Sequence, residues 1–187
     1  MKRSECTICL LPLQAEHAEV FHEWISDREA VEYSLSIFQK NRDLRWVSGY
    51  IDSIVSDKSS WNMVIYCNGI PIGYAGLVNV SLHNRSAEYF ILIGNKSFWN
   101  RGIGTNVGVQ VVNHAFSAMK LHRISLTVSD CNIAAIRSYQ KIGFIVEGRM
   151  RDACLRQGKY HDKVIMAILE QQWHNKALHP TAGNASV

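Results

Sequence analysis

The sequence predicts a single α/β domain in which a mixed sheet carries helices on both faces. Its 187 residues suit one domain with a sizeable core, and 47% hydrophobic against 19% charged residues indicate a globular chain. Strand-like and helix-like apolar patterns follow one another in the order βααα ββ β α β α ββ. The chain has no internal repeat and no linker. We therefore expect a domain over residues 1–174, followed by a polar tail over residues 175–187.

The first part of the chain predicts an edge strand and three helices. Thr7–Leu13 alternates weakly between apolar and polar residues and contains Pro12, which suits a strand at a sheet edge. The capping-box pattern in Ser26–Glu29 predicts that a short helix opens there. The three helices are expected over Gln14–Ile25, Ser26–Tyr33 and Arg42–Val55.

A hairpin and a buried strand come next. Asn68-Gly69 favours a type I′ turn, because both positions accept positive φ, and it joins predicted strands at Trp61–Cys67 and Ile70–Val80. In Glu88–Ile93 nearly all side chains are large and apolar, as in an interior strand buried on both faces.

The last third of the domain predicts a helix, a strand, a second helix and a hairpin. The first helix follows Gly104 and carries an apolar stripe that ends at Met119. Either Asp130 or Asn132 caps the second helix, and Gly143 ends it. The strands are expected at His122–Val128, Phe144–Leu155 and Tyr160–Leu169.

Gly102 and Gly104 stand where the helix after the buried strand begins. Backbone N–H groups at a helix start lack intrahelical partners and favour an anion such as phosphate. Lys96 and Arg101 add positive charge there, and Thr105 adds a hydroxyl. The alternative is that the two glycines only form a tight turn. A dinucleotide fingerprint is not complete, because Val107 occupies the third glycine position, and the chain has no P-loop motif.

The run IGNKSFWNRGIGT resembles the pyrophosphate-binding loop of the GCN5-related N-acetyltransferases, or GNAT family. Trp99 stands where the general motif has Gln or Arg, as in the ribosomal-protein N-terminal and polyamine acetyltransferase branch. Residues 132–144, from Asn132 through Tyr139 to a Lys-Ile-Gly-Phe end, are similar to the family's second signature. The resemblance covers Ile8–Leu169. It implies a mostly antiparallel sheet in which two strands splay apart to hold acetyl-CoA.

The resemblance also implies a set of cofactor contacts. Backbone N–H groups would hold the pyrophosphate, while backbone groups of the buried strand would meet the pantetheine arm as an added strand does. Asn132 would bond the same arm or act only as a helix cap. Lys96 and Arg101 would screen the phosphate charge or be plain surface residues. The pyrophosphate residues are Gly102, Ile103, Gly104 and Thr105, and the strand residues are Ile91, Leu92 and Ile93.

Acetylating an amine requires a base and benefits from an acid. A lysine-like amine has a pKa of about 10.4, so freeing it at pH 7 costs about 4.6 kcal/mol. Glu88, a carboxylate in an apolar strand, is the candidate base, and burial would raise its pKa. Alternatively, Glu88 pairs with Arg85. Tyr139 is the candidate acid for the leaving thiolate, a role that the resemblance also implies, or else a packed aromatic.

The predicted function is therefore direct transfer of acetyl from acetyl-CoA to a primary amine in a ternary complex. The acceptor is left open between a protein N-terminus, a polyamine and an amino sugar. A catalytically silent acyl-CoA-binding regulatory module is the alternative, and plain nucleotide binding is a third hypothesis. Early carboxylates that would suit a polycation, including Glu29 and Glu32, are followed by Lys40, Arg42 and Arg45, which weakens that case.

Composition excludes several partners. The net charge of +4 is too small and scattered to favour nucleic acid, and no apolar run reaches the roughly 18 residues of a membrane span. The first residues do not form a signal peptide, and five dispersed cysteines suggest buried reduced thiols, hence the cytosol. No metal motif occurs among the eight histidines.

The tail resembles read-through ends of bacterial integron cassettes. A homodimer is left open.

Overall fold

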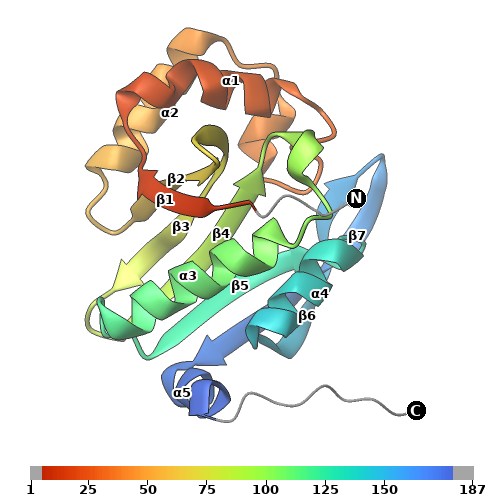
Figure 1. The fold of residues 1–187 in the computed structure, drawn as a ribbon. Coiled ribbons are helices and arrows are strands. Elements are labelled where there is room, and N and C mark those ends of the chain that lie inside the picture. The colour runs from red at the N-terminus through yellow and green to blue at the C-terminus, as the bar shows by residue number, and fades with distance from the viewer. Residues whose placement is uncertain (1–5, 179–187) are drawn as a thin grey trace, which may run out of the picture.

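The computed structural model describes residues 6–178 and confirms the predicted fold class. Seven strands form one sheet in the order β1-β2-β3-β4-β5-β7-β6 (Figure 1). The β4–β5 pair is parallel and the other five adjacent pairs are antiparallel. The strands are β1 (Ile8–Pro12), β2 (Trp61–Cys67), β3 (Ile70–Ser81), β4 (Ser86–Ile93), β5 (Arg123–Ser129), β6 (Ile145–Arg156) and β7 (Lys159–Leu169). The α-helices are α1 (Ala18–Ser26), α2 (Leu44–Ser56), α3 (Ile103–Ser117), α4 (Ile133–Ile142) and α5 (Glu170–Leu178).

The turns with a local chemical signal form as predicted. Asn68 and Gly69 both have positive φ, 52° and 81°, between β2 and β3. Asn132 caps α4 through its side-chain oxygen, which accepts from the backbone N–H of Ala135. Gly143 ends that helix with φ of 123°. These residues therefore set the boundaries of the hairpin and of α4.

The predicted helix over Ser26–Tyr33 does not form. The Asp27 carboxylate accepts from the backbone N–H groups of Glu29 and Ala30, and the segment continues as turns. A capping box would need the Glu29 side chain to reach back to the helix start. Here that side chain contacts Lys96 instead, 67 residues away. A long-range ion pair thus replaces the local contact on which the prediction depended.

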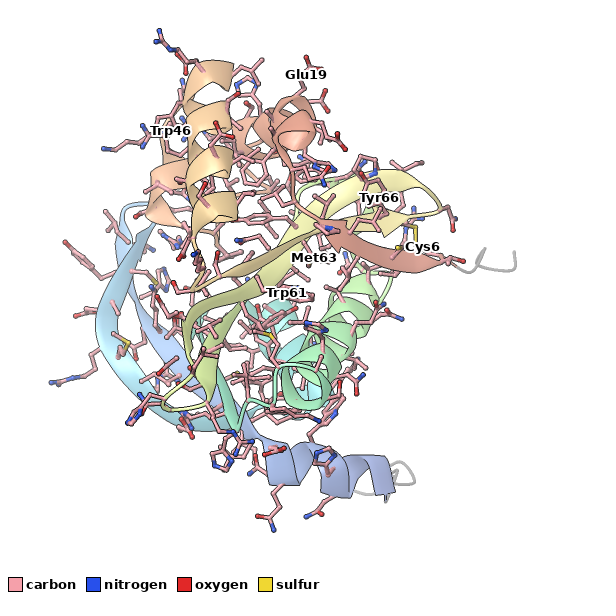
Figure 2. The ribbon with its side chains drawn as sticks, turned by 90° about the vertical axis from the view of Figure 1, so that its left-hand side faces the viewer. Cys6, Glu19, Trp46, Trp61, Met63 and Tyr66 are labelled. Carbon is pink, nitrogen blue, oxygen red and sulfur yellow. A yellow bond between two sulfur atoms is a disulfide. The ribbon has the colours of Figure 1, made fainter. Side chains whose placement is uncertain are left out.

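Two hydrophobic clusters lie on opposite faces of the sheet. One packs α3 and α4 against the sheet and includes Tyr89 of β4, while the other packs α1 and α2 and includes Leu92 of the same strand. Trp61 of β2, labelled in Figure 2, packs in the α3–α4 cluster. Its ring stacks on that of His114 of α3, with the ring centroids 4.3 Å apart. Alternate residues of each strand therefore serve different helix layers.

The cysteines do not support the prediction of buried reduced thiols. Cys6 forms a disulfide with Cys67, because β1 pairs with β2 and places the two Cα atoms 5.6 Å apart (Figure 2). Cys9 is exposed, Cys131 is half-buried and Cys154 is buried. The cysteine pattern consequently gives no argument for a reducing compartment.

Beyond β7 the chain forms α5, which continues through the first four residues of the predicted tail, 175–178. The remaining tail, residues 179–187, lies outside the described residues. Within the described part of the chain, no helix combines the length and the apolar character of a membrane span.

The Phe21 ring tests the packing of the α1–α2 layer. It is fully buried and contacts the rings of Trp24, Phe38, Tyr50 and Tyr74, with centroids 4.8–6.0 Å apart. We expect Phe21→Ala to lower the free energy of unfolding by about 3–5 kcal/mol in urea denaturation. Leu82→Ala, at a side chain that is 79% exposed, should stay within about 0.5 kcal/mol of the parent. Equal losses in the two variants would contradict this assignment of the core.

Candidate active site

The parallel strands β4 and β5 separate part-way along their length. They pair at three positions, ending with Glu88 opposite Ser125, although β4 continues to Ile93 and β5 to Ser129. Over the same stretch, β4 remains paired with β3 and β5 with β7. The sheet therefore stays intact on both outer sides while the shared edge opens, as the predicted splay requires (Figure 1).

Backbone groups in a strand alternate in direction, so only some of β4 faces this gap. The Leu92 carbonyl points toward β3, where a Cβ atom added to Gly73 would collide with it. The backbones of Ile91 and Ile93 therefore face the gap. The Ile93 carbonyl already accepts from the indole N–H of Trp99 at 2.8 Å. Of the three residues predicted to meet a pantetheine arm, Ile91 is thus the best placed, and Leu92 is turned away.

The glycine segment opens α3 as predicted. Gly102 is the N-cap with φ of 76°, and no atom would lie within 4 Å of a Cβ atom there. The first helical bond at this end runs from the Asn106 N–H to the Gly102 carbonyl. In the described part of the chain, no protein acceptor bonds the N–H groups of residues 102–105. Four amides are therefore available to an anion at the positive end of the helix.

The side chain of Thr105 has a structural partner. Its hydroxyl lies 2.8 Å from that of Ser138 and joins α3 to α4. Ile103, which is 3% exposed, anchors the first turn of α3 in the core. Ile103 consequently has only its backbone N–H to offer a ligand, and the Thr105 hydroxyl is shared with Ser138.

Lys96 and Arg101 differ in their contacts, although the sequence predicts the same role for both. The Lys96 ammonium lies 2.7 Å from Glu29 and 2.9 Å from Asp27, and hydrogen bonds to these two carboxylates raise its pKa. Its charge is therefore engaged within the protein. Arg101 is exposed, and its guanidinium lies 5.2 Å from the centre of the Phe98 ring. Of these two cations, Arg101 is the one that remains available to a phosphate at the helix start.

Tyr139 lies on α4 among other aromatic rings. Its ring is 6.0 Å from those of Tyr89 and Phe144, in edge-to-face arrangements. The side chain is half-buried, and burial raises its pKa to about 12. The phenol therefore keeps its proton throughout the neutral range and can act there as a general acid, not as a general base.

Tyr89 is a feature that sequence reasoning missed. Its hydroxyl is buried with no hydrogen-bond partner, and burial raises its pKa well above the usual value. The sequence showed only an aromatic residue inside an apolar strand, which is ordinary for a core. An unpartnered buried hydroxyl becomes visible only when the packing of α3 and α4 is known.

Glu88 lies where the two strands part. It is half-buried rather than enclosed, and its carboxylate accepts from the Asn79 side-chain amide at 3.2 Å. Arg85, the alternative partner, forms its ion pair with Glu170 instead, at 3.2 Å. By strand alternation Glu88 shares the α1–α2 face with Leu92, whereas Tyr139 packs on the α3–α4 face. The candidate base and acid therefore approach the gap from opposite sides of the sheet.

A cavity of about 350 Å³ lies between the segment after α1 and the β6–β7 turn. A second cavity of about 250 Å³ adjoins it and shares Glu32, Arg156 and Gln157. The Glu32 carboxylate accepts from the Gln157 side chain, which links the two walls. The sequence predicted the β6–β7 hairpin but gave its turn no functional role. The first cavity is lined by Arg28, Glu29, Glu32, Gln39, Leu155, Arg156 and Gln157.

Comparison with known proteins agrees with this geometry. The family model described as an acetyltransferase (GNAT) domain matches residues 7–145. A spermidine N(1)-acetyltransferase of Escherichia coli K12 is 26% identical over 95% of this chain and 92% of its own length. A putative ribosomal N-acetyltransferase of Bacillus subtilis is 29% identical over 58% of this chain and 59% of its own length.

Solved structures show the same fold. The spermidine N-acetyltransferase of Vibrio cholerae, in complex with CoA and spermine, superposes with a TM-score of 0.82 at 22% identity, over 90% of this chain and 98% of that one. Because the family match covers well over half of the chain, it establishes the family and, with it, the acetyl donor and the reaction type. The chain belongs to the GNAT family of acetyltransferases, and it is an acetyl-CoA-dependent enzyme that acetylates an amine.

Proposed function

We propose that this chain transfers acetyl from acetyl-CoA directly to a primary amine of a polyamine, within a ternary complex. The observation that carries the proposal is the open edge between β4 and β5 beside four unpaired amides of α3. Acetyl-CoA fits both parts, because a flexible pantetheine arm joins its thioester to its diphosphate. The relatives named spermidine acetyltransferases favour a polyamine over the other acceptors.

The donor is held mainly by backbone groups in this proposal. The N–H groups of residues 102–105 bind the pyrophosphate, and Arg101 supplies the nearby positive charge. Ile91 bonds the pantetheine arm as an added strand would. Asn132 uses its carbonyl oxygen as the cap of α4, so its side-chain NH₂ can donate to the same arm.

Glu88 acts as the general base and Tyr139 as the general acid in this proposal. Glu88, directly or through water, accepts a proton from the substrate ammonium, which leaves a nitrogen lone pair to attack the thioester carbonyl. As the carbon–sulfur bond breaks, Tyr139 gives its phenolic proton to the departing sulfur. Glu88 then releases its proton to solvent, and Tyr139 regains one. The placement of the two groups on opposite faces lets amine and thioester meet within the gap.

The acceptor occupies the cavity beside the β6–β7 turn in this proposal. A polyamine carries several ammonium groups, and carboxylates are their natural partners. Glu32 is the better candidate, since Glu29 is already paired with Lys96. Arg28 and Arg156 line the same cavity and limit how much positive charge it can hold. We therefore expect one ammonium to bind near Glu32 while another enters the gap.

An amine panel tests the acceptor. Spermidine and spermine should release thiol from acetyl-CoA much faster than an amino sugar or a peptide with a free N-terminus. Glu32→Gln should raise KM for spermidine about tenfold, the value of one charge-assisted contact, with a smaller change in kcat. Glu19→Gln, at an exposed residue of α1, is the matched control and should leave KM unchanged (Figure 2). Turnover of peptides alone, or of no amine in the panel, would overturn the proposal.

Two Tyr→Phe substitutions test the role of Tyr139 as general acid. Tyr139→Phe should lower kcat about 100-fold, within the range that general acids contribute, with acetyl-CoA affinity retained. Tyr89→Phe removes a neighbouring buried hydroxyl and should leave kcat within about twofold. Because the pKa of Tyr139 is about 12, the donor form persists at every lower pH, and titration of this group should not reduce kcat up to about pH 9. Parental kcat in Tyr139→Phe would rule out the role.

The donor site is tested by the two cations that the sequence could not distinguish. Calorimetry should show Kd for acetyl-CoA rising about tenfold in Arg101→Ala, the loss expected for one contact to a phosphate. Lys96→Ala should change Kd by less than about twofold, because Asp27 and Glu29 already hold that ammonium. The reverse order of effects would show that the phosphate lies elsewhere.

A further inference from the structure

Three potential metal ligands of different chemistry meet at the carboxyl end of β5. Asp130 and Cys131 follow that strand directly, and His161 comes from β7. One ligand atom from each side chain lies within 4.8 Å of the other two, and all three residues are half-buried. Cys131 and His161 also line the cavity of about 250 Å³. None of these three residues has a part in the acetyl transfer proposed above.

The Asp130 carboxylate has one satisfied oxygen and one that lacks a partner. Its Oδ2 accepts from Arg149 at 2.7 Å, and Arg149 is in turn bonded to Asp162 at 3.1 Å. Its Oδ1 is buried without a hydrogen bond. Nδ1 of His161 lies 3.6 Å from this oxygen, which is too far for a hydrogen bond, although the two groups form an ion pair when the imidazole is protonated. A buried carboxylate oxygen with no donor is unfavourable unless a ligand completes it.

The separation of 3.6 Å suits a shared ion. Two ligands each about 2.0–2.1 Å from Zn²⁺ at the tetrahedral angle lie about 3.4 Å apart, and a thiolate at about 2.3 Å lies only slightly farther from its neighbours. Small side-chain rotations would therefore bring all three atoms onto one ion. Carboxylate, thiolate and imidazole are all established zinc ligands, and three protein ligands leave a fourth position open.

Neighbouring groups already orient the Asp130 and Cys131 side chains. Arg149 holds the Asp130 carboxylate through the oxygen that the ion would not use. The Ser129 hydroxyl lies 3.0 Å from Cys131 Sγ and 3.4 Å from Cys154 Sγ, so it can donate to a thiolate at Cys131. The Cys154 thiol points toward the His161 carbonyl at 3.5 Å. Such outer contacts are typical of metal centres, where they fix the geometry of the ligands.

Charge does not oppose the ion. The basic residues on the cavity wall, Arg156 and Lys159, are accompanied by Glu32. An ion of charge +2 bound by one carboxylate and one thiolate forms a group with no net charge. Arg149 is shared between Asp130 and Asp162, so its own charge is balanced.

We propose that Asp130, Cys131 and His161 bind a single divalent ion of the Zn²⁺ class, with the fourth coordination position open to the smaller cavity. The hard cations Ca²⁺ and Mg²⁺ prefer all-oxygen ligands and are not expected to compete. Binding deprotonates the thiol and releases protons, so affinity should increase with pH.

Titration of the full-length chain with Co²⁺, in the absence of oxygen and with the free thiols reduced, tests the site without any measurement of turnover. One equivalent should produce tetrahedral Co²⁺ absorption together with a thiolate-to-cobalt charge-transfer band, and Zn²⁺ should displace it stoichiometrically. Mg²⁺ at the same concentration should not. Absence of a thiolate band, or more than one equivalent at equal affinity, would overturn the proposal.

Ligand variants assign the band to these residues. Cys131→Ser should abolish the charge-transfer band, and His161→Gln should keep it while weakening Co²⁺ binding at least about tenfold, because losing a ligand costs no less than losing an outer partner. Cys9→Ser removes an exposed thiol and is the matched control, with full binding expected. Circular dichroism and acetyl-CoA affinity report whether each variant folds. A band that survives in folded Cys131→Ser, or full affinity in folded His161→Gln, would refute the assignment.

Discussion

The parting of two parallel strands is the constraint on which the rest of the site depends. β4 and β5 are each followed by a helix, so α3 and α4 both begin at the end of the sheet where these strands separate. Helix N-termini carry partial positive charge and unpaired N–H groups. One constraint thus supplies an opening in the sheet and an anion site next to it. The Thr105–Ser138 hydroxyl contact joins the two helices that border this opening.

The sheet also separates the two halves of the proposed chemistry. Strand alternation sends Tyr89 to the α3–α4 layer and Leu92 to the α1–α2 layer, and Glu88 shares the second face. Donor and acceptor can therefore enter from different sides and meet only where β4 and β5 are unpaired. In the proposed mechanism, this arrangement would let a carboxylate on a strand and a phenol on a helix serve one reaction without a direct contact between them.

Local chemistry could be predicted from the sequence, whereas contacts across the fold could not. Residue type alone favours positive φ at Asn68-Gly69, Gly102 and Gly143, and it favours a helix cap at Asn132. The ion pairs of Lys96 could not be predicted, because its partners Asp27 and Glu29 lie almost 70 residues earlier. The Cys6–Cys67 disulfide and the group of Asp130, Cys131 and His161 could not be predicted either, because these residues meet only in the fold and no spacing motif joins them. The helix expected over Ser26–Tyr33 failed for the same reason, because the Glu29 side chain contacts the distant Lys96.

In the proposed complex, unpaired amides at the start of α3 hold the diphosphate of CoA. Backbone hydrogen exchange, followed residue by residue by NMR with and without saturating CoA, tests it most directly. We expect exchange at residues 102–105 and at Ile91 to slow on binding, and exchange in the β2–β3 turn at Asn68 and Gly69 to stay unchanged. Saturation with CoA that leaves the amides of residues 102–105 exchanging at their free rate would contradict it.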